Sequence, residues 1–146
     1  MVKVEKSKTV NAPQEKIFSL ITDFEKLPSR FPNRYRAVKI VERSGNVVTA
    51  EEDVTVAGRE IHQVVKHTLD PSKKLRSEVI EGDTKGTVVQ ISLTPESGDR
   101  TNVSIDADLK LGKMGSMLGL LAKGKIKDGL ERMIDEFENT VKSAGL

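Results

Sequence analysis

The feature that most constrains the fold is an alternation of apolar and polar residues across residues 37–110. In its clearest segment, polar side chains separate Val103, Ile105 and Ala107. A period of two is typical of half-buried strands, and turn signals divide the region into six strand candidates. The turn signals are Ser44-Gly45-Asn46, Ala57-Gly58, Asp70-Pro71-Ser72, Gly82-Asp83 and Glu96-Ser97-Gly98-Asp99. Such short turns predict an antiparallel meander with one buried face and one wet face.

The first ten residues also alternate and predict a further strand. Lys6 and Lys8 share the phase of Val4 and Val10 within it, so charged side chains fall on its apolar side. A bulge or an exposed sheet edge would accommodate them.

Helical segments flank the meander on both sides. The segment NAPQEKIFSLIT predicts a helix with Pro13 in its first turn, and DFEKLPSRFP predicts a second short helix ended by Pro28 or Pro32. A long C-terminal helix has its apolar face formed by Ile126, Leu130, Met133, Ile134, Phe137 and Val141. The sequence therefore predicts an α+β fold: a curved seven-stranded antiparallel sheet wrapped around a long C-terminal helix, with two short helices between the first and second strands.

The composition narrows the possible functions. At 146 residues and 36% hydrophobic content, we expect one soluble domain spanning residues 1–146. Only 3% of the residues are aromatic, so the interior must be aliphatic, and a cavity between sheet and helix is expected. The net charge of +2 and the few aromatics argue against a nucleic-acid partner. The lack of cysteine excludes thiol chemistry and fits a cytoplasmic location, and we expect no cofactor.

Three segments and the C-terminal helix carry a resemblance to a known group. The segments are VNAPQEKIFSLITDFEKLPSRFP, EGDTKGTVVQISLTP and TNVSIDADLKL. Together they resemble the START-like superfamily, whose helix-grip fold occurs in polyketide cyclases and dehydrases, lipid-transfer domains, pollen allergens and coenzyme-Q-binding proteins. The resemblance covers essentially the whole chain. It implies a hydrophobic ligand, lipid-like, isoprenoid or polyketide-like, between the sheet and the last helix. It specifies activity poorly, because the superfamily contains both binders and enzymes.

Two polar residues interrupt the apolar phase of their strand candidates and form a candidate catalytic pair. Glu52 lies in the phase of Val48 and Val54, and His67 lies in that of Val65. If their strands are neighbours, the carboxylate would orient the imidazole, which suits acid–base chemistry. The alternative is a polar pair that only stabilises a partly wet cavity.

The candidate ligand-binding residues lie in the same inward phases or in the segment before the C-terminal helix. Tyr35 follows the second short helix, where it would sit at the cavity mouth or pack under a loop. The full predicted set is Tyr35, Gln63, Val65, Ser77, Val89, Ile91, Met114, Met117, Leu118 and Leu121.

Three other chemistries are not supported by the sequence. His62 and His67 are five residues apart on one strand and project to opposite faces, and no cysteine is present, so we expect no metal site. No nucleophile elbow of the G-x-S-x-G type occurs, which argues against a serine triad. The segment GLLAKGKI fits G-x-x-x-x-G-K, but Ile126 stands where Ser or Thr should bind magnesium.

The segment KLGKMGSMLGLLAKGKIKDGL raises a separate question. It contains a Met/Leu stripe made of Met114, Met117, Leu118 and Leu121. If the whole segment were one straight helix, this stripe would lie nearly opposite the apolar face of the C-terminal helix. Either the helix bends near Gly124, or the stripe is exposed. In the second case the lysines from Lys110 to Lys127 would frame an apolar patch suited to transient membrane-surface contact and to gating the cavity.

Two functions follow as hypotheses. The first is binding or transport of a hydrophobic small molecule. The alternative is a cyclase, dehydrase or hydrolase that uses His67 with Glu52 in the same cavity.

Overall fold

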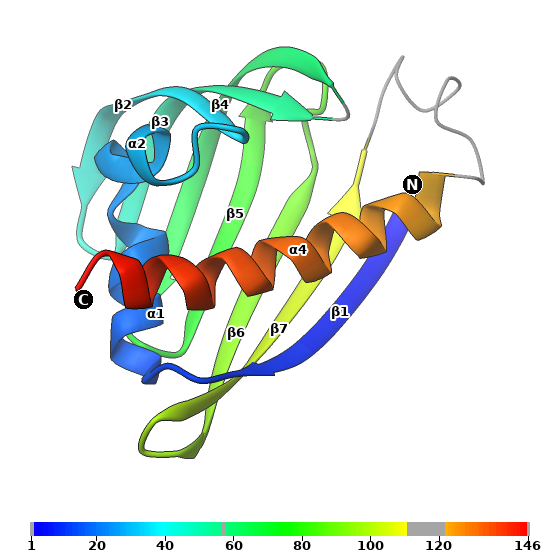
Figure 1. The fold of residues 1–146 in the computed structure, drawn as a ribbon. Helices are drawn as coiled ribbons and strands as arrows, with labels where there is room; N and C mark the ends of the chain where they lie inside the picture. Colours follow the sequence, from blue (N-terminus) through cyan, green and yellow to red (C-terminus); the bar gives the residue numbers. More distant parts are fainter. Residues whose placement is uncertain (1, 57, 111–121, 146) are drawn as a thin grey trace.

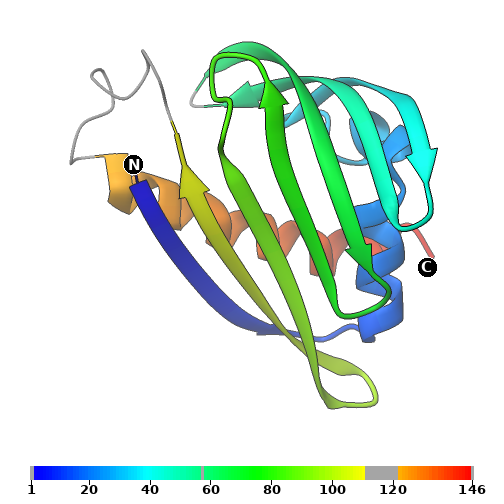
Figure 2. The ribbon, with the colours of Figure 1, turned by 180° about the vertical axis from the view of Figure 1, so that it is seen from behind.

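The computed structural model describes residues 2–56, 58–110 and 122–145 of the chain. Within these residues, seven strands form one antiparallel sheet, and the long helix α4 crosses one face of it (Figure 1). Seen from behind, the sheet curves, and α4 lies beyond it (Figure 2). The predicted α+β helix-grip architecture is therefore confirmed.

The strands lie in the order β1-β7-β6-β5-β4-β3-β2, which makes β1 and β2 the edges of the sheet. After β1 the chain passes through the short helices to the opposite edge, and β2 to β7 then return strand by strand to β1. The bounds are β1 Val2–Val10, β2 Tyr35–Ser44, β3 Val47–Val56, β4 Arg59–Asp70, β5 Lys74–Glu81, β6 Val88–Ser97 and β7 Arg100–Leu109. All six strand candidates of the meander and the separate first strand are thus present.

The short helices begin and end differently from the sequence prediction. Helix α1 (Gln14–Thr22) starts after Pro13, whose extended backbone makes it the N-cap, and the Pro13 carbonyl accepts hydrogen bonds from the N–H groups of Lys16 and Ile17. A 3-10 turn, η1 (Phe24–Lys26), then leads into α2 (Leu27–Arg30).

Pro28 lies inside α2, near its start, rather than ending it. The first turn of a helix has N–H groups without intrahelical partners, so a proline there loses nothing. The helix ends at Arg30, and Phe31 takes a non-helical backbone conformation before Pro32. Of the two prolines proposed as terminators, only Pro32 stands after the helix.

Helix α4 (Ala122–Ser143) closes the fold by packing against β1 and α1. It buries Leu130, Ile134, Phe137 and Val141, which recur at helical spacing. The opposing side of this core is formed by Val4, Val10, Ile17, Leu20, Phe24, Val103 and Ile105. The Met/Leu stripe at Met114, Met117, Leu118 and Leu121 lies outside the described residues, so its orientation and a bend near Gly124 stay predictions.

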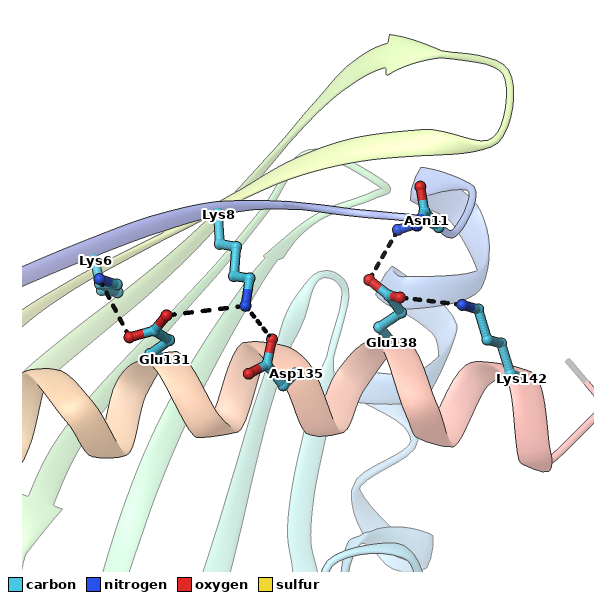
Figure 3. Close-up of polar contacts among 7 residues, drawn as sticks. All are labelled: Lys6, Lys8, Asn11, Glu131, Asp135, Glu138 and Lys142. Carbon is cyan, nitrogen blue, oxygen red and sulfur yellow. Dashed lines mark hydrogen bonds and ion pairs between the residues drawn. The ribbon is translucent and has the colours of Figure 1, made fainter.

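A line of polar contacts joins β1 to α4 (Figure 3). The Lys8 ammonium lies 2.6 Å from Asp135 and 3.9 Å from Glu131, and Lys6 lies 3.5 Å from Glu131. The register of β1 against β7 is continuous, so no bulge accommodates the two lysines. They lie on the helix side of an edge strand, as the second sequence alternative required, and they pair with acids that sequence patterns along β1 could not reveal.

Glu138 ends this line, where its carboxylate accepts two hydrogen bonds. The Asn11 backbone N–H donates to its carboxylate at 3.0 Å, and Lys142 donates at 3.0 Å. The Asn11 hydrogen bond and then Lys142 hold the pKa of Glu138 below its ordinary value of 4.5. Because the folded-state pKa is the lower one, this carboxylate stabilises the fold fully above its unfolded-state pKa, and the contribution is lost as pH falls through the folded-state value.

We therefore expect Glu138→Gln to be less stable than the native chain at neutral pH. The difference should shrink progressively below about pH 5, because the native carboxylate becomes protonated there. Urea unfolding followed by circular dichroism at several pH values measures it. A difference that stays constant down to acidic pH would contradict the assignment.

Candidate functional site

Four polar side chains on the inner face of three neighbouring strands form one hydrogen-bonded set, here called the polar network. They are Glu52 on β3, Gln63 and His67 on β4, and Ser77 on β5. Glu52 and His67 are 2% and 5% exposed, whereas Gln63 and Ser77 are only partly buried. The predicted inward phase is therefore correct for all four, and the buried pair lies between two more accessible ends.

The hydrogen bonds run continuously through the polar network. His67 Nε2 lies 2.7 Å from Glu52 Oε2, and His67 Nδ1 lies 2.7 Å from Ser77 Oγ. Gln63 Nε2 donates to Glu52 Oε1 at 3.5 Å, a long contact. Both imidazole nitrogens are thus already engaged within the protein.

The strand register explains which members meet. His67 is directly opposite Ser77 in the β4–β5 pairing, while Glu52 is directly opposite Gln63 in the β3–β4 pairing. Residues directly opposite in an antiparallel pair have Cβ atoms about 4.5–5.5 Å apart, so short side chains can touch there. The neighbour relation that the sequence argument required of β3 and β4 is present.

Glu52 and His67 are not opposite one another, and a small residue lets them meet. Ala50 pairs directly with Val65 between them and is fully buried. The two long polar side chains therefore lean toward each other above this pair. A residue larger than alanine at position 50 would occupy the space that they share.

An aromatic ring from outside the sheet holds the imidazole. Phe24, the first residue of η1, stacks on His67 with ring centroids 4.3 Å apart and planes 22° apart. Phe24 is 1% exposed, so its position is set by the core. Sequence reasoning missed this contact, since nothing in the order of residues connects a turn after the first helix with β4.

The hydrogen-bond partners of His67, Glu52 and Ser77, determine which ring nitrogen carries a proton. When the imidazole is neutral, Nε2–H donates to the Glu52 carboxylate, and Nδ1 is left to accept from the Ser77 hydroxyl. When the imidazole is charged, both nitrogens donate, to Glu52 and to Ser77. The polar network can therefore take up one proton at its centre without losing a hydrogen bond.

Tyr35 lies near the same carboxylate. It packs against the buried pair Val54 and Ile61 and is itself partly buried. Burial, and then the negative charge of Glu52, raise the pKa of Tyr35 above its ordinary value of 10, although Arg34 acts in the opposite direction. Tyr35 therefore keeps its phenolic proton at neutral pH and can only act there as a neutral donor or acceptor.

A second histidine–carboxylate pair lies on the outer face of the same strands. His62 Nδ1 is 2.6 Å from Asp53 Oδ1, and both side chains are exposed. The hydrogen bond to Asp53 raises the pKa of His62 above 6.5. The two histidines do face opposite sides of the sheet, and the outer pair is a natural control for the inner one.

The remaining predicted ligand-binding residues divide into two sets. Val65 and Ile91 are buried, and Val89 is partly buried against the core. Met114, Met117, Leu118 and Leu121 lie outside the described residues. Two surface hollows, of about 260 Å³ and 350 Å³, contain no member of the polar network. Within the described residues, no group of histidine, aspartate and glutamate side chains is arranged to hold a metal ion.

Comparisons with known proteins agree with this architecture. The family model described as polyketide cyclase / dehydrase and lipid transport matches residues 1–138. The chain is similar to TTHA0849 from Thermus thermophilus, with a TM-score of 0.83 and 20% identity over 99% of this chain and 100% of that one. It is also similar to a START superfamily protein from Mycobacterium smegmatis, with a TM-score of 0.77 and 23% identity over 97% and 98% of the two chains.

A third similar structure is the Zhui aromatase/cyclase from Streptomyces sp. R1128, with a TM-score of 0.75 and 19% identity over 96% of this chain and 90% of that one. At these identities the structural likeness shows the fold alone. No curated protein sequence matches the chain. None of the helices in the described ranges is long and apolar enough to cross a membrane.

Proposed function

Because the chain belongs to the polyketide cyclase / dehydrase and lipid transport family, we propose that it binds a hydrophobic small molecule between the inner face of the sheet and α4. The observation that carries this proposal is the polar network, which lies beside the apolar residues Val65, Val79 and Val89, with its centre buried and its two ends, Ser77 and Gln63, partly exposed. Those ends are the groups that a bound molecule can reach.

In such a site, apolar and polar side chains would contribute differently to binding. Contact with aliphatic residues such as Val65, Val89 and Ile91 would supply most of the affinity, at about 25 cal/mol for each Å² of apolar surface removed from water. A hydroxyl or amide contact to Ser77 or Gln63 would add about 0.5–1.5 kcal/mol and fix the orientation of the ligand. The ligand we propose is therefore mainly apolar with one or two polar groups: lipid-like, isoprenoid or polyketide-like.

The alternative, an acid–base enzyme of the cyclase or dehydrase type, has a specific observation in its favour. His67 lies between a carboxylate and a hydroxyl at 2.7 Å from each, an arrangement that moves protons readily. However, both ring nitrogens are occupied, so a proton from a substrate would have to pass through Ser77. We therefore place binding first and assign any chemistry to the Ser77 end.

The transient membrane contact proposed for the lysines up to Lys127 stays a prediction. Lys125 and Lys127 are both exposed on the first turns of α4, which is compatible with it.

We expect Val89→Glu to weaken binding of a long-chain fatty acid carrying an environment-sensitive fluorophore by about tenfold or more. An unpaired charge facing an apolar ligand costs more than the 1.4 kcal/mol to which a tenfold change corresponds. The chain has no tryptophan, so a fluorescence titration has little protein background.

Val88→Glu is the matched control, since Val88 is the neighbouring residue on β6 and alternation turns it to the outer face. It should change affinity less than twofold, and Val89→Phe should reduce affinity by filling space without adding charge. Equal affinities for both glutamate variants, with both folded by circular dichroism, would contradict the proposed site. So would an absence of probe binding by the native chain.

A further inference from the structure

We propose that Ser77 is an activated nucleophile that accepts an acyl group from a hydrophobic ester or thioester, with His67 as its base and Glu52 as the carboxylate that orients the base. The proposal goes beyond binding, but it rests on the proposed function for how a hydrophobic substrate reaches Ser77. It starts from the contacts of three side chains on three adjacent strands.

A serine becomes nucleophilic when a base lies within hydrogen-bond distance of its hydroxyl and a third group orients that base. Ser77 Oγ lies 2.7 Å from His67 Nδ1, and His67 Nε2 lies 2.7 Å from Glu52 Oε2. Such triads are recognised by geometry and roles rather than by position in the sequence. The missing G-x-S-x-G motif therefore excludes a nucleophile elbow but not this arrangement.

The ring nitrogens have the reverse assignment from the serine-protease template, in which Nε2 faces the serine and Nδ1 faces the carboxylate. Either nitrogen of a neutral imidazole can be the acceptor, and the partner of the other nitrogen decides which one is. Because Glu52 takes the Nε2 proton, Nδ1 is left free to accept from Ser77. The chemical roles are therefore preserved.

The three groups are held in place before any substrate arrives. Phe24 stacks on the imidazole, and Ser77 lies directly opposite His67 in a paired antiparallel register. A base fixed in this way needs little reorganisation when the proton moves. The buried members are the base and the carboxylate, while Ser77 is the partly exposed one.

The surroundings of Ser77 select the acyl group. Leu75 and Val79 flank it on β5 with the same orientation and are buried, and Val89 is directly opposite on β6. None of these three side chains carries charge or hydrogen-bonding capacity. We therefore assign an uncharged aliphatic or aromatic acyl group to the site.

The step balances without a cofactor. Ser77 Oγ bonds to the carbonyl carbon as its proton passes to His67 Nδ1, and Glu52 pairs with the imidazolium that forms. The ester C–O bond, or the thioester C–S bond, then breaks, and the leaving alkoxide or thiolate takes the proton from Nδ1. Water repeats the sequence on the acyl-serine and releases the free acid, which returns the hydroxyl to Ser77.

The test uses phenylmethanesulfonyl fluoride, a small hydrophobic reagent that sulfonylates activated serines and releases fluoride. Intact-mass and peptide mass spectrometry should find one adduct per chain, on Ser77. Labelling should be absent in Ser77→Ala and slower by about 100-fold or more in His67→Ala, the scale of general-base catalysis. Glu52→Gln keeps the size of the side chain and should also slow labelling.

His62→Ala and Asp53→Asn are the matched controls, because that pair has the same chemistry on the outer face. Both should label at the native rate. An adduct on another residue, or equal labelling rates in His62→Ala and His67→Ala with both variants folded, would overturn the proposal.

A second reagent separates this proposal from simple binding. With p-nitrophenyl hexanoate, the native chain should release about one equivalent of nitrophenol in a rapid phase and carry a hexanoyl group on Ser77. If Ser77 stays unmodified while the fluorescent fatty acid still binds in a Val89-dependent way, the nucleophile fails and binding stands. If Ser77 is modified but no fatty acid binds, the binding site fails and the nucleophile stands.

Discussion

Glu52→Ala should lower the free energy of unfolding by about 1–3 kcal/mol, the usual cost of leaving a buried hydrogen-bond donor without its partner. Glu52 is 2% exposed, and its carboxylate is the acceptor that pairs with His67 Nε2 at 2.7 Å. The substitution leaves that nitrogen buried and unpaired, and it removes the acceptor of Gln63 as well. Urea unfolding followed by circular dichroism measures the loss.

Asp53→Ala provides the control for this prediction. Asp53 is the next residue on β3 and contacts His62 at 2.6 Å, but both groups are exposed to water. Water replaces a lost partner there, so the substitution should change stability far less. If Glu52→Ala and Asp53→Ala lose equal stability, burial does not explain the contribution of the Glu52–His67 pair to folding.

Phe24→Ala should also cost about 3–5 kcal/mol, the range found for phenylalanine removed from a packed core. Phe24 is 1% exposed, and its ring both fills the core and covers the His67 imidazole. Loss of the ring should therefore shift the His67 ring resonances in an NMR spectrum as well as the unfolding midpoint.

Phe18→Ala separates the loss of core packing from the loss of contact with the His67 imidazole. Phe18 is a buried residue of α1, outside the Phe24–His67 stack, so its removal should lower stability comparably and leave the imidazole resonances in place. Phe24→Leu keeps most of the volume and should lose mainly the stacking, worth about 0.5–1.5 kcal/mol. Unchanged His67 resonances in Phe24→Ala would show that the stack does not position the ring.

The sheet was predictable because its signals are local. Period-two alternation and short turns identify each strand, and the phase of Val48, Ala50 and Val54 places Glu52 on the inner face without knowledge of any partner. The same argument assigned His67 inward and His62 outward correctly. Antiparallel hairpins join neighbours in sequence, so β3, β4 and β5 had to lie side by side.

What the sequence could not supply was contact between residues distant along the chain. The Phe24–His67 stack joins a turn near the first helix to β4, and Lys8 meets Asp135 across most of the chain. Ser77 was assigned inward, but its distance to His67 depends on the exact register of β4 against β5, where a shift occurs between Val64 and Val65. A short sequence motif cannot reveal the group of Glu52, His67 and Ser77, because these residues come from three different strands.

Lys6 and Lys8 on β1 also affect whether the edge of the sheet can pair with a strand from another molecule. β1 is an edge strand, and an edge with unpaired backbone groups can recruit a strand from another molecule. Lys6 and Lys8 place charge on the inner side of that edge, and their acidic partners come from α4 of the same chain. Inward-pointing charges on an edge strand are one of the ways in which natural sheets discourage edge-to-edge pairing.

At the other edge, β2 pairs with irregular register, which bends the edge away from a flat template. Both margins of the sheet thus disfavour growth by strand addition. On β1, the residues that discourage strand addition are the same lysines that pair with α4.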